Sequence, residues 1–187
     1  MSNLTDFFPS GGGGGLTPKF EEFNATGFFT PSQALIDAGG YIEVFLVGGG
    51  GGSSLGYQGA AGGETILSRM YLTIAQNNGV TVIIGSGGTA GDGGNSQFVA
   101  AFGAGGEDIT ALGGEVNGEQ INKMGAGYSA FSNSVGSPGN GILGYGSGSA
   151  IGNNTKGGIT TPKANSGQGG RNAVTGGSGY CLIKWYE

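Results

Sequence analysis

Short apolar runs recur along this chain and are separated by segments rich in glycine. The run Tyr41–Val47 (YIEVFLV) is the clearest predicted strand, because nearly all of its residues are β-branched, aromatic or otherwise apolar. Further strands are predicted at Lys19–Phe23, Gly27–Thr30, Thr65–Ile74, Val80–Ile84, Ser96–Val99, Asp108–Leu112 and Tyr180–Tyr186.

Two of these segments alternate with the period of two that is typical of a half-buried strand. In residues 65–74, one face carries Ile66, Met70, Leu72 and Ile74, and the other carries Thr65, Arg69 and Thr73. In the last segment, Cys181, Ile183 and Trp185 share a face. Asn77-Asn78-Gly79 predicts a hairpin turn that joins residues 65–74 to 80–84, because Asn and Gly tolerate a positive φ.

Helix is predicted only at Pro31–Ala38, for one or two turns. Elsewhere a helix would include glycines, and each costs about 1 kcal/mol in a helix interior. The sequence therefore predicts an all-β fold, a small β-sandwich-like domain with long glycine-rich loops.

Glycine accounts for 47 of the 187 residues, far above its usual share of about 7%. The region from Gly113 to Gly179 is the richest in Gly, Ser and Asn, and two interpretations are open for it. It is disordered, or its glycines form extended, polyproline II-like segments that pack side by side. The 10% aromatic content and the net charge of only −5 argue against disorder of the whole chain. Within this region, the spaced aromatic residues favour ordered loops, because they could pack against the glycine segments and hold them in place.

The first 15 residues read as an arm on a flexible tether. An apolar cluster, Leu4, Phe7, Phe8 and Pro9, precedes the glycine run Gly11–Gly15. Such an arm either docks on another protein or is a frayed terminus. Residues 16–187 then form one glycine-rich β-domain, with a variable loop region at about 113–170.

Composition argues against several classes of function. The chain has no histidine and one cysteine, Cys181, which lies in an apolar run and is expected to be a buried, inert thiol. These counts disfavour Cys-His or Ser-His-Asp catalysis and zinc binding. The seven Lys and Arg residues are scattered and form no basic patch for nucleic acid. No signal peptide and no apolar run of about 20 residues is present, so we expect no membrane insertion.

Three motifs that carry chemistry elsewhere lack their usual context here. Gly85–Ala90 matches G-x-G-x-x-A, but Gly91-Asp92-Gly93-Gly94 follows where a nucleotide-binding helix should begin. Residues 87–92 are a single imperfect copy of a calcium-binding repeat, which works in tandem stacks. The candidates for a weak calcium site are Asp92, Glu107, Asp108, Glu115 and Glu119, and we expect them to be solvated loop charges. The candidates for a glycosidase pair are Glu64, Glu107 and Glu115, each of which follows Gly-Gly, and loops would hold such a pair poorly.

The order of strands and glycine runs resembles the glycine-rich domains of bacteriophage and prophage tail-fibre and tail-adhesin proteins. The resemblance rests on GYIEVFLVGGGGGSS, on the hairpin-like run at 62–98, on ITALGGE and on the closing GGSGYCLIKWYE. It implies a virion tail component without catalysis or cofactor, made in the host cytoplasm. The implied partners are other tail proteins, reached through the arm, and a host surface glycan or outer-membrane protein. The assembly implied is a homotrimer.

Aromatic residues within glycine-rich segments are the candidate receptor contacts, since aromatic side chains offer large contacts at low entropic cost. They are Tyr57, Tyr128, Phe131 and Tyr145. In the opposing interpretation, these aromatic side chains pack inside the domain and hold the loops in place. Three other functions stay open: a purely structural tail or capsid decoration protein, a polysaccharide depolymerase, and a secreted matrix or ice-interacting protein.

Overall fold

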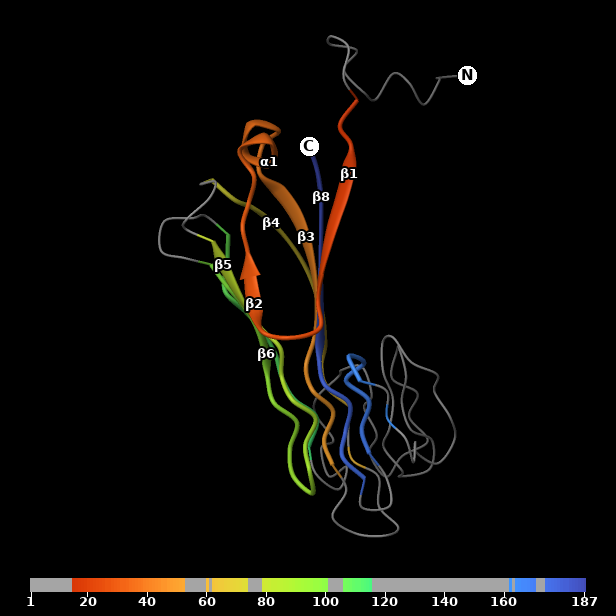
Figure 1. Cartoon of the computed structure of the whole chain (residues 1–187). Coiled ribbons are helices and arrows are strands. Elements are labelled where there is room, and N and C mark those ends of the chain that lie inside the picture. Colours follow the sequence, from red (N-terminus) through yellow and green to blue (C-terminus); the bar gives the residue numbers. More distant parts are fainter. Residues whose placement is uncertain are drawn as a thin grey trace, which may run out of the picture.

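A computed structural model of the chain describes residues 15–52, 60, 62–73, 79–100, 106–115, 162, 164–170 and 174–187. Within these residues, two antiparallel four-stranded sheets enclose an apolar core, and glycine-rich segments continue from the strands beyond the sheets (Figure 1). The prediction of an all-β, sandwich-like fold is therefore confirmed.

Each sheet combines strands that are distant in the sequence. The first sheet has the order β1-β8-β3-β4, with β1 at Pro18–Phe23, β8 at Tyr180–Tyr186, β3 at Tyr41–Val47 and β4 at Thr65–Tyr71. The second has the order β2-β5-β6-β7, with β2 at Gly27–Phe29, β5 at Val80–Ile83, β6 at Ser96–Val99 and β7 at Ile109–Ala111. The central strands β3 and β8 begin and end where the sequence predicted them.

The core lies between the sheets and follows the period-two pattern. Ile42, Val44 and Leu46 of β3 are fully buried, and they face Val82 and Phe98 of the second sheet across the core. Each such side chain stabilises the fold by about 1.5–3 kcal/mol relative to an exposed position. Alternate residues of the same strands consequently point away from the core, to an outer face.

A short helix, α1 at Gln33–Asp37, lies between β2 and β3 in the sequence and contributes Leu35 to the core. Its N-cap Ser32 accepts a hydrogen bond of 3.0 Å from the amide of Leu35, and the Leu35 side chain is buried. The helix ends before Gly39 and Gly40, whose φ values of +105° and +71° favour glycine. The short helix predicted at Pro31–Ala38 is confirmed.

The predicted hairpin between residues 65–74 and 80–84 is wrong. β4 pairs with β3 in the first sheet, whereas β5 pairs with β2 and β6 in the second. The apolar faces of β4 and β5 explain the difference, because Met70 and Val82 both contribute to the core cluster. Strands that follow one another thus lie in opposite sheets and bury their apolar faces together.

Beyond the sheets, seven glycine-rich segments pack against one another through their backbones. We call them the glycine lattice, and they comprise residues 48–52, 62–64, 85–88, 91–94, 112–115, 164–170 and 174–179. Four of the seven directly adjoin a strand in the sequence and two more, 85–88 and 91–94, are one residue away from one, so the sheets set where these segments run (Figure 1).

Segment 48–52 lies at the centre of the lattice. Its backbone hydrogen-bonds to all six other segments, at distances of 2.7–2.9 Å. The partner residues in these bonds are Glu64, Gly88, Gly91, Gly94, Gly114, Gly170 and Gly177. A β-strand bonds to two neighbours at most, so this is a different mode of backbone packing from the sheets.

The central segment turns with a period of three residues. A Cβ atom added at positions 48 and 51 would meet residues 112 and 115, one at 49 and 52 would meet residues 86 and 88, and one at 50 would meet residue 168. Three residues per turn is the repeat of the polyproline II helix. In the region from Gly113 to Gly179, Gly114, Gly170 and Gly177 hydrogen-bond to this central segment, whereas residues 164–167 form a turn in which Asn165 and Gly167 have φ values of 58° and 63°. Residues 116–161, 163 and 171–173 lie outside the described residues, so the choice between disorder and extended packing stays a prediction there.

Glycine is required in the lattice because the backbones approach too closely for a side chain. A Cβ atom at Gly50 would lie 2.0 Å from the carbonyl oxygen of Gln168, and one at Gly49 would lie 2.0 Å from that of Ser86. Neither glycine has a positive φ, so the constraint is space and not backbone conformation.

We predict that Gly50→Ala destabilises the domain by about 3 kcal/mol or more, because backbone atoms cannot rotate away as a side chain can. Gly91→Ala is the matched control, since its Cβ atom would meet only the Thr89 carbonyl oxygen at 3.8 Å. For the control, the free energy of unfolding should stay the same or rise by up to about 1 kcal/mol. Urea denaturation of both variants measures the difference, and equal stabilities would contradict the close packing.

Candidate functional site

The end of the glycine lattice that is remote from the sheets brings together the ends of several segments. Gly52 donates to the carbonyl of Gly91 at 2.8 Å, and an added Cβ at Gly51 would lie 2.5 Å from the carbonyl oxygen of Glu115. Gly170 donates to Gly51 at 2.9 Å. We call this part of the lattice the distal end.

Three stretches of sequence leave or enter at the distal end. Residues 53–59 lie between Gly52 and Ala60, and Ala60 donates to Gly170 at 2.8 Å. Residues 171–173 follow Gly170, and residues 116–161 follow Glu115. The lattice therefore fixes the points at which these stretches are attached.

The candidate contact residues proposed from the sequence all lie outside the described residues. Tyr57 belongs to the stretch 53–59, and Tyr128, Phe131 and Tyr145 belong to the stretch 116–161. The arm residues lie outside as well, and they are Leu4, Phe7, Phe8 and Pro9. Their roles stay predictions.

A turn at Thr89-Ala90-Gly91 forms the described rim of the distal end. Ala90 has a φ of 52°, in the left-handed region that non-glycine residues seldom adopt. The hydroxyl oxygens of Thr89 and Thr175 lie 3.2 Å apart and link two segments at this rim.

The motif Gly85–Ala90 lies in the lattice and does not open a helix. An added Cβ at Gly87 would lie 1.7 Å from the carbonyl oxygen of Gly176, so this backbone already packs against protein. A nucleotide phosphate needs the free amides of a helix N-terminus at this place. The structure therefore gives no support to a cofactor site in this motif.

Two of the acidic candidates hold backbone in place. Glu64 accepts a hydrogen bond of 3.0 Å from the amide of Leu112, and Asp108 accepts one of 2.8 Å from Ala100. Among the described residues, no group of three or more His, Cys, Asp or Glu is arranged to hold a metal ion. Glu119 lies outside the described residues.

A second surface, which the sequence did not single out, is the outer face of the first sheet. Strand pairing arranges its side chains in three rows across the sheet. The row nearest the C-terminus holds Pro18, Tyr186, Tyr41 and Tyr71, the middle row holds Phe20, Lys184, Glu43 and Arg69, and the third row holds Glu22, Leu182, Phe45 and Leu67. We call these residues the outer face.

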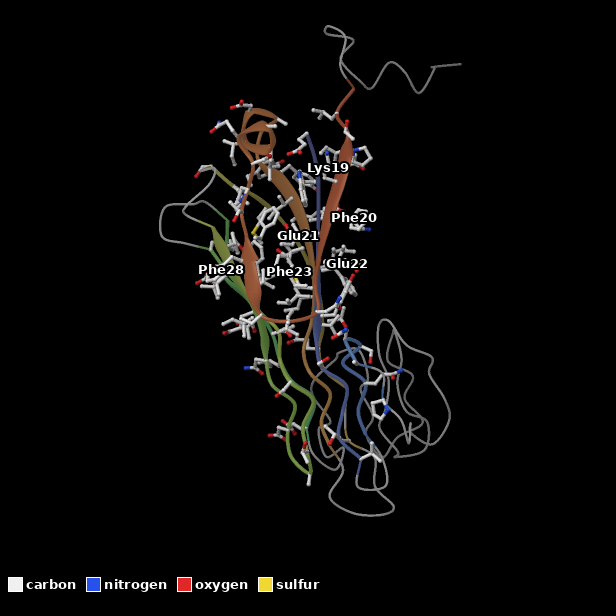
Figure 2. The ribbon with its side chains drawn as sticks, viewed as in Figure 1. Lys19, Phe20, Glu21, Glu22, Phe23 and Phe28 are labelled. Carbon is white, nitrogen blue, oxygen red and sulfur yellow. The ribbon has the colours of Figure 1, made fainter. Side chains whose placement is uncertain are left out.

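Large apolar side chains of the outer face are open to solvent. Phe20 is 69% exposed, Tyr71 64%, Leu67 59% and Tyr186 53%. Figure 2 shows Phe20 on the outer side of β1, while Phe23 of the same strand points between the sheets. The outer side of the second sheet has two rows, one with Phe28, Thr81 and Val99 and one with Ile83, Gln97 and Thr110, and it carries no charged residue at these positions.

On the outer face, Arg69 and Glu43 form an ion pair, whereas Lys184 forms none with the described residues. The carboxylate of Glu43 accepts from Arg69 Nε at 2.9 Å and from the Tyr41 hydroxyl at 3.2 Å. Lys184 lies directly across from Glu43 on β8, yet neither of the two ion pairs among the described residues includes it. The middle row thus presents one exposed cation without a counter-ion in the described part of the chain.

Near the same edge, the carboxylate of Glu187 is held by three groups. It accepts hydrogen bonds from the Ser32 hydroxyl and from Trp185 Nε1, and Lys19 lies 3.8 Å away. The Ser32 hydroxyl, together with these neighbours, lowers the pKa of Glu187 below its usual value. Glu187 thus pairs with Lys19, which is not one of the outer-face residues, so this ion pair does not involve Lys184.

The sequence contains a signal for the outer face: in β3 and β8, aromatic residues tend to alternate with smaller or aliphatic ones. In β3, aliphatic residues occupy the even positions, and Tyr41 and Phe45 occupy the odd ones. In β8, Tyr180 and Tyr186 likewise alternate with Cys181 and Ile183. The alternation in residues 180–186 was recognised, but Tyr41–Val47 is almost continuously apolar, so its aromatic side was not separated from its aliphatic side.

No family model matches the chain, and comparisons with curated proteins and with solved structures find no significant match. Among the described residues, no helix is long and apolar enough to cross a membrane.

Cys181, the chain's one cysteine, is fully buried between the sheets. Burial, together with the nearby charge of Glu21, raises the pKa of this thiol to about 12. We predict that a thiol reagent at pH 8 labels Cys181 only as fast as the domain unfolds, because only the thiolate reacts. Rapid labelling of the folded protein, followed by mass spectrometry, would contradict the buried position.

Proposed function

We propose that this chain is a non-enzymatic virion tail or tail-fibre protein that attaches the particle to the host cell surface. The gathering of three attachment points at the distal end is the observation that carries this proposal. The resemblance of the strand-and-glycine order to tail-fibre and tail-adhesin domains supports it.

The lattice suits this role because its stability depends on backbone contacts. Segment 48–52 bonds to its neighbours through amides and carbonyls, so the stretches attached at the distal end can change sequence without altering those bonds. Stretches 53–59 and 116–161 would then carry receptor specificity, with Tyr57, Tyr128, Phe131 and Tyr145 as contacts. A host glycan or an outer-membrane protein is the proposed target.

Other parts of the proposal concern assembly. The arm with Leu4, Phe7, Phe8 and Pro9 would contact other tail proteins, and the glycines that follow would let it reach them. A homotrimer, made in the host cytoplasm and carried on the virion tail, follows by analogy with the resembled family. No cofactor, nucleic acid or membrane insertion enters the proposal.

Two other functions remain as alternatives. A structural tail or capsid decoration protein would use the same rigid lattice without any receptor. A polysaccharide depolymerase would need a pair of carboxylates about 5–9.5 Å apart, and Glu64 instead holds the backbone of Leu112. Release of sugar from purified host polysaccharide would favour the depolymerase.

We predict that the purified protein competes with particles for adsorption to host cells, and that Tyr57→Ala weakens this competition by about tenfold, as expected for an aromatic binding residue. Phe28→Ala is the control, since Phe28 is 72% exposed on the second sheet, away from the distal end. The measurement is the protein concentration that halves adsorption.

Absence of competition by the folded wild-type protein would contradict the adhesin and favour the purely structural role. Equal weakening by Tyr57→Ala and Phe28→Ala would contradict a receptor site at the distal end.

A further inference from the structure

The outer face of the first sheet has two grooves and an exposed lysine, Lys184, that lines both of them. One groove of about 250 Å³ is lined by Pro18, Phe20, Tyr41 and Tyr186. A second groove of about 350 Å³ is lined by Phe45, Leu67 and Leu182. Glu43 and Lys184 line both grooves, so the exposed cation stands where the two grooves meet.

The rows of the outer face repeat every second residue along the strands, so they are about 6.7 Å apart. From the C-terminal end of β8 inward, the order is aromatic, charged and apolar. An extended peptide that lies along the strands also presents alternate side chains at this spacing. A matching ligand therefore carries large apolar residues at positions i and i+4, and an acid at i+2.

The arm of this chain has that pattern. Leu4, Asp6 and Phe8 are an apolar, an acidic and an apolar residue at alternate positions. Asp6 is the only charged side chain among the first 18 residues, so it is the natural counter-ion for Lys184. Phe7 would point away from the sheet in such an arrangement.

The tether brings the arm to the outer face of its own domain. The described chain begins at Gly15, three residues before Pro18, which itself lines the first groove. Lys184 lies on the strand next to Pro18, two residues along from Tyr186, which pairs with Pro18. The Cα atoms of Pro18 and Lys184 are therefore about 10 Å apart or less. The eleven residues from 7 to 17 span up to about 36 Å when extended, which is ample.

We propose that the arm of the free protein binds the outer face of the same chain, with Asp6 paired to Lys184 and with Leu4 and Phe8 in the two grooves. A tether of this length holds the arm at an effective concentration of about millimolar, so even a weak peptide site is occupied. The proposal is independent of the proposed function, because the contact lies within one chain. It leaves Phe7 exposed for a partner.

Mobility of the arm tests the proposal in the full-length protein. A nitroxide is attached at Ser2→Cys, which is selective because Cys181 is fully buried. Electron paramagnetic resonance should show motion slowed several-fold relative to the Asp6→Lys version of the same labelled protein. Lys184→Glu should also free the label, and the combined Asp6→Lys, Lys184→Glu protein should slow it again, because the pair is restored with exchanged charges.

Two further variants distinguish binding of specific arm side chains from nonspecific hydrophobic adhesion of the arm. Phe8→Ser should free the label, and Phe7→Ser should leave it slow. These substitutions and Asp6→Lys lie in the arm and change no residue of the described strands or core, so loss of folding does not obscure the result. Emission of Trp185, the single tryptophan, checks the fold in every variant.

The proposal is overturned if the label moves freely in the starting protein, or if the charge exchange fails to restore slow motion. It is also overturned if slow motion is lost on dilution while the mass in solution falls from dimer or trimer to monomer. That result would assign the arm to the outer face of a second copy.

Discussion

The close approach of bare backbone in the glycine lattice is the constraint on which the rest of this structure depends. Carbonyl oxygens occupy the positions where Cβ atoms would be, at 2.0 Å from the ideal Cβ of both Gly49 and Gly50. Without side chains, segment 48–52 forms hydrogen bonds to six other segments of the described chain. The lattice thus satisfies backbone groups that a loop would normally leave to water.

Two modes of packing meet where β3 passes into the lattice. Up to Val47, side chains fill the space between the sheets, and from Gly48 onward, beyond the sheets, backbone packs directly against backbone. The sheets fix the direction of most lattice segments, and the lattice carries the attachment points of residues 53–59 and 116–161 away from the core. The proposed adhesin uses this separation, because sequence change at the distal end does not reach the core.

Much of the fold follows from local pattern, and the errors have a common physical origin. β3 and β8 were predicted to the residue because both are mainly apolar runs that follow glycine, and β3 also ends at a glycine. The partner of β4 was missed because a plausible turn sequence says nothing about which sheet buries its apolar face.

Glycine content indicated extended packing, but the six-neighbour arrangement depends on residues far apart in the chain. The aromatic candidates such as Tyr57 lie outside the described residues, and the outer face emerged only from strand pairing.

Amide hydrogen exchange of the central glycines tests the account most directly. If segment 48–52 is held by its six neighbours, the amides of Gly49 and Gly50 exchange only through global unfolding, at the rate of the Val44 amide in β3. Exchange of these glycine amides at the rate of an unstructured peptide, while Val44 stays protected, would show that the lattice does not form. Resolved amide signals in a nuclear magnetic resonance spectrum give both rates from one sample.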